Sequence, residues 1–93
     1  MVRVSAGDYL LLSNSGQTLW RIQRYEDGPS YGLDLPRDVQ VWSCARYRGT
    51  PEEAQRDPDL LERWDHWVET AGHMRTRREA VTEALETSER RGI

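Results

Sequence analysis

Two histidines and two glutamates in the C-terminal half have a spacing that could hold a metal ion. Glu62, His66, Glu69 and His73 lie at positions i, i+4, i+7 and i+11, so one unbroken α-helix would place them on a single face. Carboxylate oxygens and imidazole nitrogens together are suitable ligands for a divalent cation. Gly72, however, is a residue type that commonly ends helices, and it comes before His73. We therefore interpret the four side chains as the solvent face of a helix, and the sequence predicts no metal or other cofactor.

Nucleophilic side chains are present, but none has the sequence neighbours that catalysis needs. Cys44 lies in a predicted strand with no histidine nearby to act as its base. Ser13 and Ser15 flank a turn and lack the strand, sharp turn and helix that surround a hydrolase serine. The single cysteine also excludes an internal disulfide, which fits a reducing cytoplasm. The sequence therefore predicts no catalytic residues, and a protein that is not an enzyme.

Arginines and aromatic residues are interleaved along two predicted strands. A sheet surface of this kind suits stacking on unpaired bases. It suits a protein–protein contact equally well, because arginine, tryptophan and tyrosine dominate binding energy at interfaces. A third interpretation is a solvent face on which arginines extend over aromatic rings. The binding residues predicted under the first two interpretations are Arg21, Arg24, Trp42, Arg46 and Tyr47.

The composition limits the class of protein. The chain of 93 residues has 13 basic and 16 acidic side chains, a formal net charge of −3, and every basic residue is an arginine. Net negative charge disfavours non-specific binding to nucleic acid, which depends on neutralising phosphates. No apolar run approaches the roughly 20 residues of a membrane helix, and residues 1–8 lack the apolar stretch of a signal peptide. We expect one cytoplasmic domain over residues 1–93, without membrane insertion.

A β-hairpin is predicted near the N-terminus. Residues 8–13 and 17–25 have the composition of strands, and the turn between them contains Gly16, which we expect to adopt a positive φ. If the loop has three residues, Leu10 pairs with Trp20.

A long loop and a third strand are predicted to follow. Residues 26–38 contain two glycines and two prolines, and we expect Tyr31, Leu33 and Leu35 to pack against the core. Residues 39–47 are predicted to be a strand that pairs with the second strand in a meander.

Helix signals dominate the rest of the chain. Thr50 precedes a proline and has a glutamate three residues later, which is typical of a capped helix start. Asp57-Pro58 begins a second stretch, whose apolar residues fall within roughly a third of a helical wheel; they are Leu60, Leu61, Trp64, Trp67, Val68 and Ala71. Thr76 caps a last helix over residues 76–90 with a weak apolar stripe. The sequence therefore predicts an α+β fold: a three-stranded antiparallel β-meander (8–47) followed by two α-helices (51–91), the first packed on the sheet.

The first predicted strand is apolar on both faces. Tyr9 and Leu11 point to one face, and Leu10 and Leu12 to the other. A strand of this kind is normally covered on both faces, and the weak last helix offers little cover. We therefore expect apolar surface to be left for a second chain, either a second copy in a homodimer or a different protein.

The chain resembles small accessory proteins of actinobacterial phages, in particular the mycobacteriophage type. The resemblance rests on the short length, on two short strings, and on the arginine-only composition, which indicates a GC-rich gene. The strings are Leu33-Asp34-Leu35-Pro36-Arg37-Asp38 and Val41-Trp42. The resemblance implies a protein that binds a host protein and inhibits or redirects it. The predicted function is thus a non-enzymatic, phage-encoded protein that engages and modulates a host protein in the cytoplasm of the host bacterium. The alternative left open is a small nucleic-acid-binding transcriptional regulator.

Overall fold

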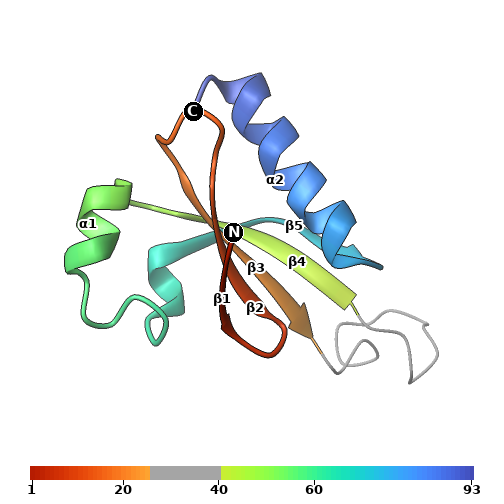
Figure 1. Cartoon of the computed structure of the whole chain (residues 1–93), viewed down its shortest axis with the longest axis horizontal. Coiled ribbons are helices and arrows are strands. Elements are labelled where there is room, and N and C mark those ends of the chain that lie inside the picture. The colour runs from red at the N-terminus through yellow and green to blue at the C-terminus, as the bar shows by residue number, and fades with distance from the viewer. Residues whose placement is uncertain (26–40) are drawn as a thin grey trace.

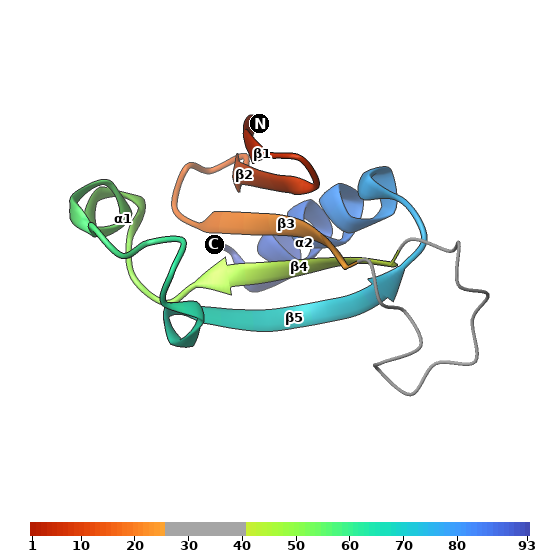
Figure 2. The same ribbon diagram turned by 90° about the horizontal axis from the view of Figure 1, so that it is seen from below.

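Five antiparallel strands form one sheet in the computed structural model, which describes residues 1–25 and 41–93 (Figure 1). The strands lie side by side in the order in which the chain makes them (Figure 2). They are β1 (Val2–Ser5), β2 (Asp8–Leu12), β3 (Leu19–Tyr25), β4 (Val41–Tyr47) and β5 (Trp67–Met74). Helix α1 (Pro51–Arg56) and the short 3₁₀ helix η2 (Trp64–His66) lie between β4 and β5, and helix α2 (Arg77–Arg91) follows β5.

Helix α2 covers one face of the sheet, which we call the helix face (Figure 2). Beneath it lie apolar side chains from the central strands, and Trp20, Ile22 and Cys44 among them are fully buried. The helix contributes small side chains at Ala80 and Ala84, which allow it to approach the sheet closely. The cluster as a whole consists of Trp20, Ile22, Trp42, Cys44, Ala80 and Ala84.

A hydrogen bond also ties α2 to the sheet. The indole Nε1 of Trp20 donates to the hydroxyl of Ser88 at 2.8 Å, and both residues are buried. A buried indole N–H without a partner would be costly, so this bond fixes the position of the helix along the strands.

The opposite face, which we call the open face, carries a second apolar cluster at one end. It consists of Leu19, Tyr47, Ala54 and Trp67. The rings of Tyr47 and Trp67 meet edge to face with their centroids 5.4 Å apart. Helix α1 lies where β4 ends and β5 begins (Figure 2), and its Ala54 packs into this cluster.

Local capping signals start both helices. At α1 the capping box is confirmed, because Thr50 Oγ1 accepts from the Glu53 N–H and the Glu53 carboxylate accepts from the Thr50 N–H, both at 3.2 Å. At α2, Thr76 Oγ1 accepts from the Glu79 N–H at 3.1 Å. The Glu79 carboxylate there accepts from the Arg75 N–H at 3.2 Å, one residue before the position that a capping box would use.

The predicted fold of a three-stranded meander followed by two helices is wrong. The sheet has five strands, and α2 with 15 residues is the main helix, whereas α1 has six. The three predicted strands correspond to β2, β3 and β4, which pair in the expected antiparallel order. The errors lie in β1, which was not predicted, and in β5, which was predicted to be helical.

Residues 57–71 contain no α-helix, although the sequence places a helix there, packed through Trp64 and Trp67. They form turns, η2 and the first part of β5. From Trp67 the chain reads Trp-Val-Glu-Thr, a run of aromatic and β-branched residues that suits a strand. Pairing with β4 satisfies the main-chain groups along this run and still buries Trp67, so the apolar residues gain their burial without a helix.

Strand β1 is only four residues long and is exposed along its length. A tight turn joins it to β2, and Gly7 in that turn has φ 73°, in the region that favours glycine. The N–H of Arg24 in β3 donates to the Gly7 carbonyl at 2.8 Å, which anchors the turn to the sheet.

The predicted hairpin is present, but its register differs by one residue from the one expected for a three-residue loop. Leu11, not Leu10, faces Trp20. The Ser13 N–H donates to the Thr18 carbonyl at 2.9 Å, so the loop holds four residues where three were assumed. A shift of one residue moves a side chain to the other face. Gly16 has φ 72°, as expected.

Both faces of β2 are partly covered within the chain. Tyr9 and Leu11 pack on the cluster beneath α2, and Leu10 packs on the cluster of the open face. Leu12 is 50% exposed. Apolar surface therefore remains at Leu12 and at Val2 and Val4 of the neighbouring β1, and the second chain, a second copy or a different protein, stays a prediction.

The expected packing of Tyr31, Leu33 and Leu35, and the first two residues of the predicted third strand, lie outside the described residues. Within residues 1–25 and 41–93, neither helix has the length and apolar character needed to span a membrane.

Candidate functional site

The five predicted binding residues do not form one patch. The strand register places Arg24, Trp42 and Arg46 on the helix face, and Arg21 and Tyr47 on the open face. Trp42 and Tyr47 are 8% and 6% exposed, because each belongs to one of the two apolar clusters. Arg24 and Arg46 are half-buried. No single partner surface contacts all five side chains.

Arg21 is engaged in a buried ion pair. Its Nε and Nη2 donate to the two carboxylate oxygens of Asp8 at 3.0 and 2.7 Å, and its Nη1 donates to the Leu61 carbonyl at 3.2 Å. With its amide oxygen turned towards Arg21, Gln23 also accepts from Nη2 at 3.1 Å. The guanidinium carbon lies 5.8 Å from the centroid of the Trp67 ring. Arg21 therefore links β2, β3 and the connection that precedes β5, and its charge is neutralised inside the protein.

Residues 57–66, the connection between α1 and β5, are irregular but firmly attached to the sheet. Trp67 Nε1 donates to the Leu60 carbonyl at 2.8 Å, next to the carbonyl of Leu61 that Arg21 binds. In an α-helix these carbonyls would accept from main-chain N–H groups four residues later. Here side chains of the sheet occupy them, which satisfies the polar groups of the connection without helical structure.

Asp57 closes the other end of this connection. Its Oδ2 accepts from the Tyr47 hydroxyl at 3.0 Å and lies 2.8 Å from His66 Nδ1, while its Oδ1 accepts from the Asp59 N–H at 3.0 Å. Partial burial acts to raise the pKa of Asp57, but the hydrogen bonds from Asp59, His66 and Tyr47 outweigh it and lower the pKa below the ordinary 3.8. Burial, together with the bond to Asp57, raises the pKa of Tyr47. The ionised Asp57 carboxylate thus holds the two ends of the connection together.

Trp64, the first residue of η2, is 81% exposed, whereas the sequence places it in the core. The Trp67 N–H donates to the Trp64 carbonyl and closes the 3₁₀ turn. Beside it, Arg63 and Asp65 form an exposed ion pair at 3.2 Å. Because the connection is attached at Leu60, Leu61 and Asp57, the indole projects from an ordered segment.

A hollow of about 120 Å³ lies between Trp64 and the open face. Its floor comes from the neighbouring strands β3, β4 and β5, and η2 supplies one wall. Two indoles, an exposed carboxylate and an amide converge on it, which is the mixture of apolar wall and few polar groups typical of a binding site. The lining residues are Arg21, Gln23, Ala45, Trp64, Trp67 and Glu69.

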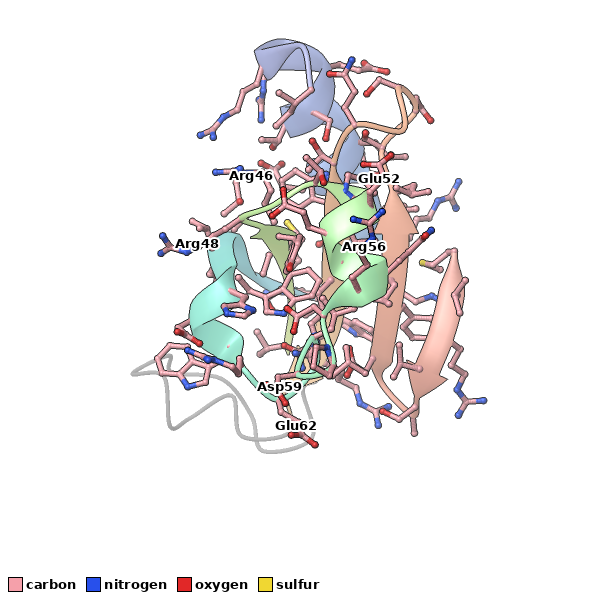
Figure 3. The ribbon with its side chains drawn as sticks, turned by 90° about the vertical axis from the view of Figure 1, so that its left-hand side faces the viewer. Arg46, Arg48, Glu52, Arg56, Asp59 and Glu62 are labelled. Atoms are coloured by element: carbon pink, nitrogen blue, oxygen red, sulfur yellow. The ribbon has the colours of Figure 1, made fainter. Side chains whose placement is uncertain are left out.

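Acidic residues predominate around this hollow. Residues 59–69, which include Trp64 and lead into β5, hold four acidic residues and one arginine, a net charge of −3. Figure 3 shows two of the carboxylates, Asp59 and Glu62, on the connection between α1 and η2. The rim of the hollow therefore attracts positive charge.

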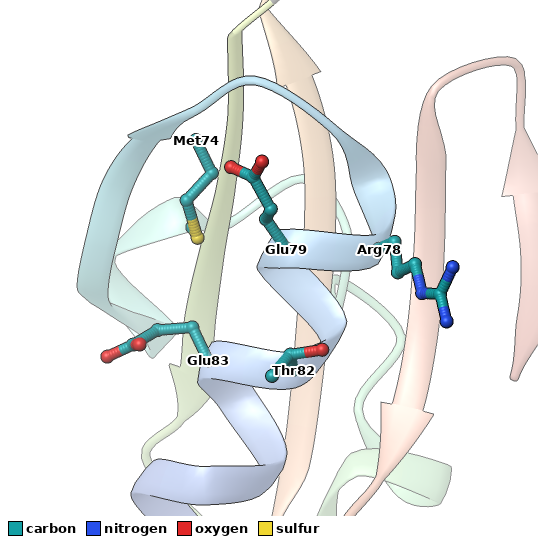
Figure 4. A pocket seen from close by; sticks show the side chains of 5 residues that line it. All are labelled: Met74, Arg78, Glu79, Thr82 and Glu83. Atoms are coloured by element: carbon teal, nitrogen blue, oxygen red, sulfur yellow. The ribbon is translucent and has the colours of Figure 1, made fainter.

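A larger hollow of about 430 Å³ lies between α2 and the end of β5 (Figure 4). Its lining residues are Met74, Arg78, Glu79, Thr82 and Glu83. In Figure 4 the Arg78 guanidinium points away from the two glutamates, so the charged groups do not converge on one point. No aromatic ring is among the lining residues, and four of the five project from the exposed side of one helix.

A third hollow, of about 320 Å³, faces the ring of His66. Asp57 holds the Nδ1 of this ring, an arrangement that orients a histidine as a general base. The residues that line the hollow are Tyr47, Arg48, Gly49, Glu53 and His66. They include no serine, threonine or cysteine that the histidine would activate, so we assign this contact to holding the connection in place.

The four residues with metal-ligand spacing are dispersed, because the helix that would align them is absent. Glu62 lies in the connection, His66 in η2, and Glu69 and His73 in β5. In the described part of the chain, no group of three or more candidate ligands comes together.

Cys44 is fully buried beneath α2. Burial, and secondly the carboxylate of Glu83, raise the pKa of its thiol to about 11. The thiol is therefore protonated at neutral pH and out of reach of a substrate. Ser13, whose hydroxyl accepts from the Thr18 N–H at 3.2 Å, serves the hairpin loop.

Comparison of the chain with models of protein families, with curated proteins and with solved structures gave no match. The candidate site is thus assigned from the geometry of this chain.

Sequence reasoning missed the hollow because it placed Trp64 in the core and Glu69 on the solvent side of a helix. The aromatic and β-branched run that begins at Trp67 was the signal for a strand. No pattern in the sequence indicated that Trp64 would point outwards.

Proposed function

We propose that this chain is a non-enzymatic protein-binding protein that engages a host protein through Trp64 and the hollow beside it. The observation that carries the proposal is the 81% exposed indole on a connection attached to the sheet. Tryptophan is enriched among the residues that dominate binding energy at protein interfaces. An anchor that is already ordered loses less conformational entropy on binding than one on a free loop.

The exposed indole offers enough apolar area to anchor an interface. A tryptophan buries roughly 150–250 Å² when fully covered. With 81% of Trp64 exposed, about 120–200 Å² is available to a partner. At ~25 cal/mol per Å², covering it contributes about 3–5 kcal/mol before the costs of association. Contacts around the hollow must supply the remainder.

The proposed partner is a protein of the bacterial host. This part of the proposal draws on the resemblance of the composition and short strings to accessory proteins of actinobacterial phages, whose members commonly inhibit or redirect a host machine. The thiol of Cys44 is buried and protonated, and is therefore not available as a nucleophile.

The geometry does not favour the alternative of a small nucleic-acid-binding transcriptional regulator. Arg21, which that alternative would use on the sheet, is neutralised by Asp8. The acidic residues around Trp64 would repel phosphates.

The proposed partner is a different chain, and the predicted homodimer needs its own measurement. Sedimentation velocity at micromolar concentration distinguishes the 10.9 kDa monomer from a species of twice that mass.

Trp64→Ala and Leu12→Ala form a matched pair for testing the proposal. Each variant removes an exposed apolar side chain: Trp64 is 81% exposed and Leu12 is 50% exposed. Leu12 lies on β2, which β3 and β4 separate from β5. Wild type and both variants are used as baits in lysate of an actinobacterial host, and affinity for the purified partner is then measured by calorimetry. We expect Trp64→Ala to weaken binding by about 30-fold or more, as for an interface hot spot, and Leu12→Ala to bind like wild type.

Circular dichroism establishes that all three baits are folded. A partner that binds Trp64→Ala as tightly as wild type would contradict the proposal. Retention of no host protein above background by folded wild-type bait would contradict it too.

A further inference from the structure

We infer that the hollow beside Trp64 receives an arginine side chain from a basic segment of the partner protein. This inference rests on the proposed function. The guanidinium group stacks on the Trp64 indole and donates to the carboxylate of Glu69.

The size of the hollow indicates a single side chain. At about 120 Å³ it is much smaller than the roughly 300–1,000 Å³ of pockets that hold drug-sized ligands or cofactors. It opens beside a protruding indole, which a partner must contact as it inserts the side chain. The occupant is therefore part of a larger molecule that also covers Trp64.

The aromatic wall suits a planar cation. This chain already places arginines against its rings: Arg77 lies with its guanidinium carbon 4.8 Å from the centroid of Tyr9, and Arg21 lies 5.8 Å from that of Trp67. Trp64, exposed to solvent, presents an indole that an incoming cation reaches. Indole gives the most favourable cation–π interaction among the aromatic side chains, and guanidinium stacks on it where ammonium does not.

Among the polar groups that line the hollow, the Glu69 carboxylate is the acceptor that a cation would satisfy. Glu69 brings an exposed carboxylate, whereas the amide oxygen of Gln23 is turned towards Arg21. The positive charge of Arg21 is taken up by Asp8, with Nε, Nη1 and Nη2 all donating within the protein. An apolar occupant would leave the Glu69 carboxylate covered without a donor, which is costly. A carboxylate occupant would meet Glu69 and its acidic surroundings.

The charge around the hollow extends this preference to the whole partner segment. The net charge of −3 over residues 59–69 attracts a basic segment and repels an acidic one. Such attraction acts mainly on the association rate and weakens as salt rises.

Gly72 leaves room for the Glu69 carboxylate on this face. A Cβ at Gly72 would stand 2.6 Å from Glu69 Oε1, so Gly72→Ala must displace that carboxylate. The backbone of Gly72 is not in the positive-φ region, and alanine is therefore compatible with the strand. This variant moves the acceptor while the charge of the protein stays the same.

The probes for the test are N-acetyl-arginine-methylamide, its lysine counterpart and the uncharged citrulline counterpart. Each is titrated into the full chain, labelled with ¹⁵N, and the indole N–H signals of the four tryptophans are followed by NMR. We expect the arginine probe to shift the Trp64 signal in a saturable way and to leave that of Trp20, bonded to Ser88 beneath α2, in place.

Variants then separate the carboxylate from general charge effects. Glu69→Gln and Gly72→Ala should each weaken arginine binding by about three- to ten-fold. Glu86→Gln, an exposed position on α2, removes the same charge from the other side of the sheet and should bind as wild type.

Lack of saturable binding of the arginine probe would overturn the inference. Binding of the citrulline or lysine probe as tight as that of the arginine probe would also overturn it, and so would wild-type affinity of Glu69→Gln for the arginine probe. The proposed function fails separately. If a host partner binds in a manner that depends on Trp64 but not on Glu69, the surface is an interface and the arginine assignment is wrong. If no partner depends on Trp64, the proposed function itself fails, whatever the probes do.

Discussion

Replacing Asp8 by asparagine should destabilise the fold strongly. The Asp8 and Arg21 side chains are 13% and 10% exposed, and two N–H groups of the guanidinium depend on this carboxylate. Removing one partner of a buried ion pair typically costs about 3–5 kcal/mol, because the other charge is left uncompensated. The residual exposure and the nearby amide oxygen of Gln23 place the expected loss at about 3 kcal/mol. For a domain of this size, that loss corresponds to a fall in Tm of roughly 12–24 °C.

Urea unfolding followed by tryptophan fluorescence measures this loss. Asp65→Asn is the matched control, since it makes the same chemical change in the exposed Arg63–Asp65 pair, whose side chains are 55% and 62% exposed. We expect no measurable change there, because exposed ion pairs contribute little. Equal stability of Asp8→Asn and Asp65→Asn would refute the assignment of Arg21 as a buried charge that needs its partner.

A double variant tests the same reasoning from the other side. Asp8→Leu with Arg21→Met removes both charges, and apolar pairs of similar volume are often as stable as the ion pair they replace. The double variant loses the bond to the Leu61 carbonyl, at a cost of about 1 kcal/mol. It should nevertheless be more stable than Asp8→Leu alone, and a double-mutant cycle gives the coupling energy.

Four further predictions concern single sites. Ser88→Ala leaves the Trp20 indole N–H buried without an acceptor, and urea unfolding should show a loss of about 1–3 kcal/mol. Thr76→Ala removes the N-cap of α2 and should cost about 1 kcal/mol in the same assay, which Thr76→Ser should largely restore. Cys44 is buried and its pKa is raised to about 11, so at pH ~8 it should react with iodoacetamide only as fast as the protein opens. Mass spectrometry measures the reaction rate, which denaturant should raise steeply. The pKa of Asp57 is lowered in the fold, so the ionised Asp57 carboxylate stabilises the protein above the ordinary pKa of 3.8. This stabilisation is lost as the pH falls through the lower folded-state pKa. The difference in unfolding free energy between wild type and Asp57→Asn should therefore narrow below pH 3.8.

The parts of the fold that follow from the sequence are those decided by neighbouring residues. The capping box at Thr50 and the positive φ of Gly16 each depend on a few adjacent positions, and both are present. The strand segments of β2, β3 and β4 were predicted from local composition as well. The hairpin register was not, because it depends on whether the loop holds three or four residues.

The errors arise where a distant segment decides the outcome. On a wheel the apolar residues from Leu60 to Ala71 form one stripe, but the same residues also tolerate a turn followed by a strand. The choice is made by β4, which offers main-chain partners to β5, and by Arg21 and Trp67, whose side chains bind the carbonyls of Leu61 and Leu60. Arg21 and Leu61 are 40 residues apart, so no local window contains this information.

The predicted binding residues illustrate a general difficulty with small sheets. Arginines and aromatic residues on a strand are typical of a binding interface, but they are equally typical of a core edge at which arginines extend over buried rings. In this chain α2 covers one face, and α1 packs Ala54 into the cluster at one end of the other, so Trp42 and Tyr47 are largely buried.

Among the described residues, the connection and the edge strand β5 supply two exposed side chains that line the hollow, Trp64 and Glu69. Trp64 and Glu69 are both exposed, so their loss removes little folding energy, whereas alanine at Trp42 or Tyr47 would empty a core position. An alanine scan of the five predicted residues would confuse loss of fold with loss of binding. A scan of Trp64 and Glu69 separates the two, because a partner that depends on this hollow must respond to variants whose unfolding free energy stays close to that of wild type.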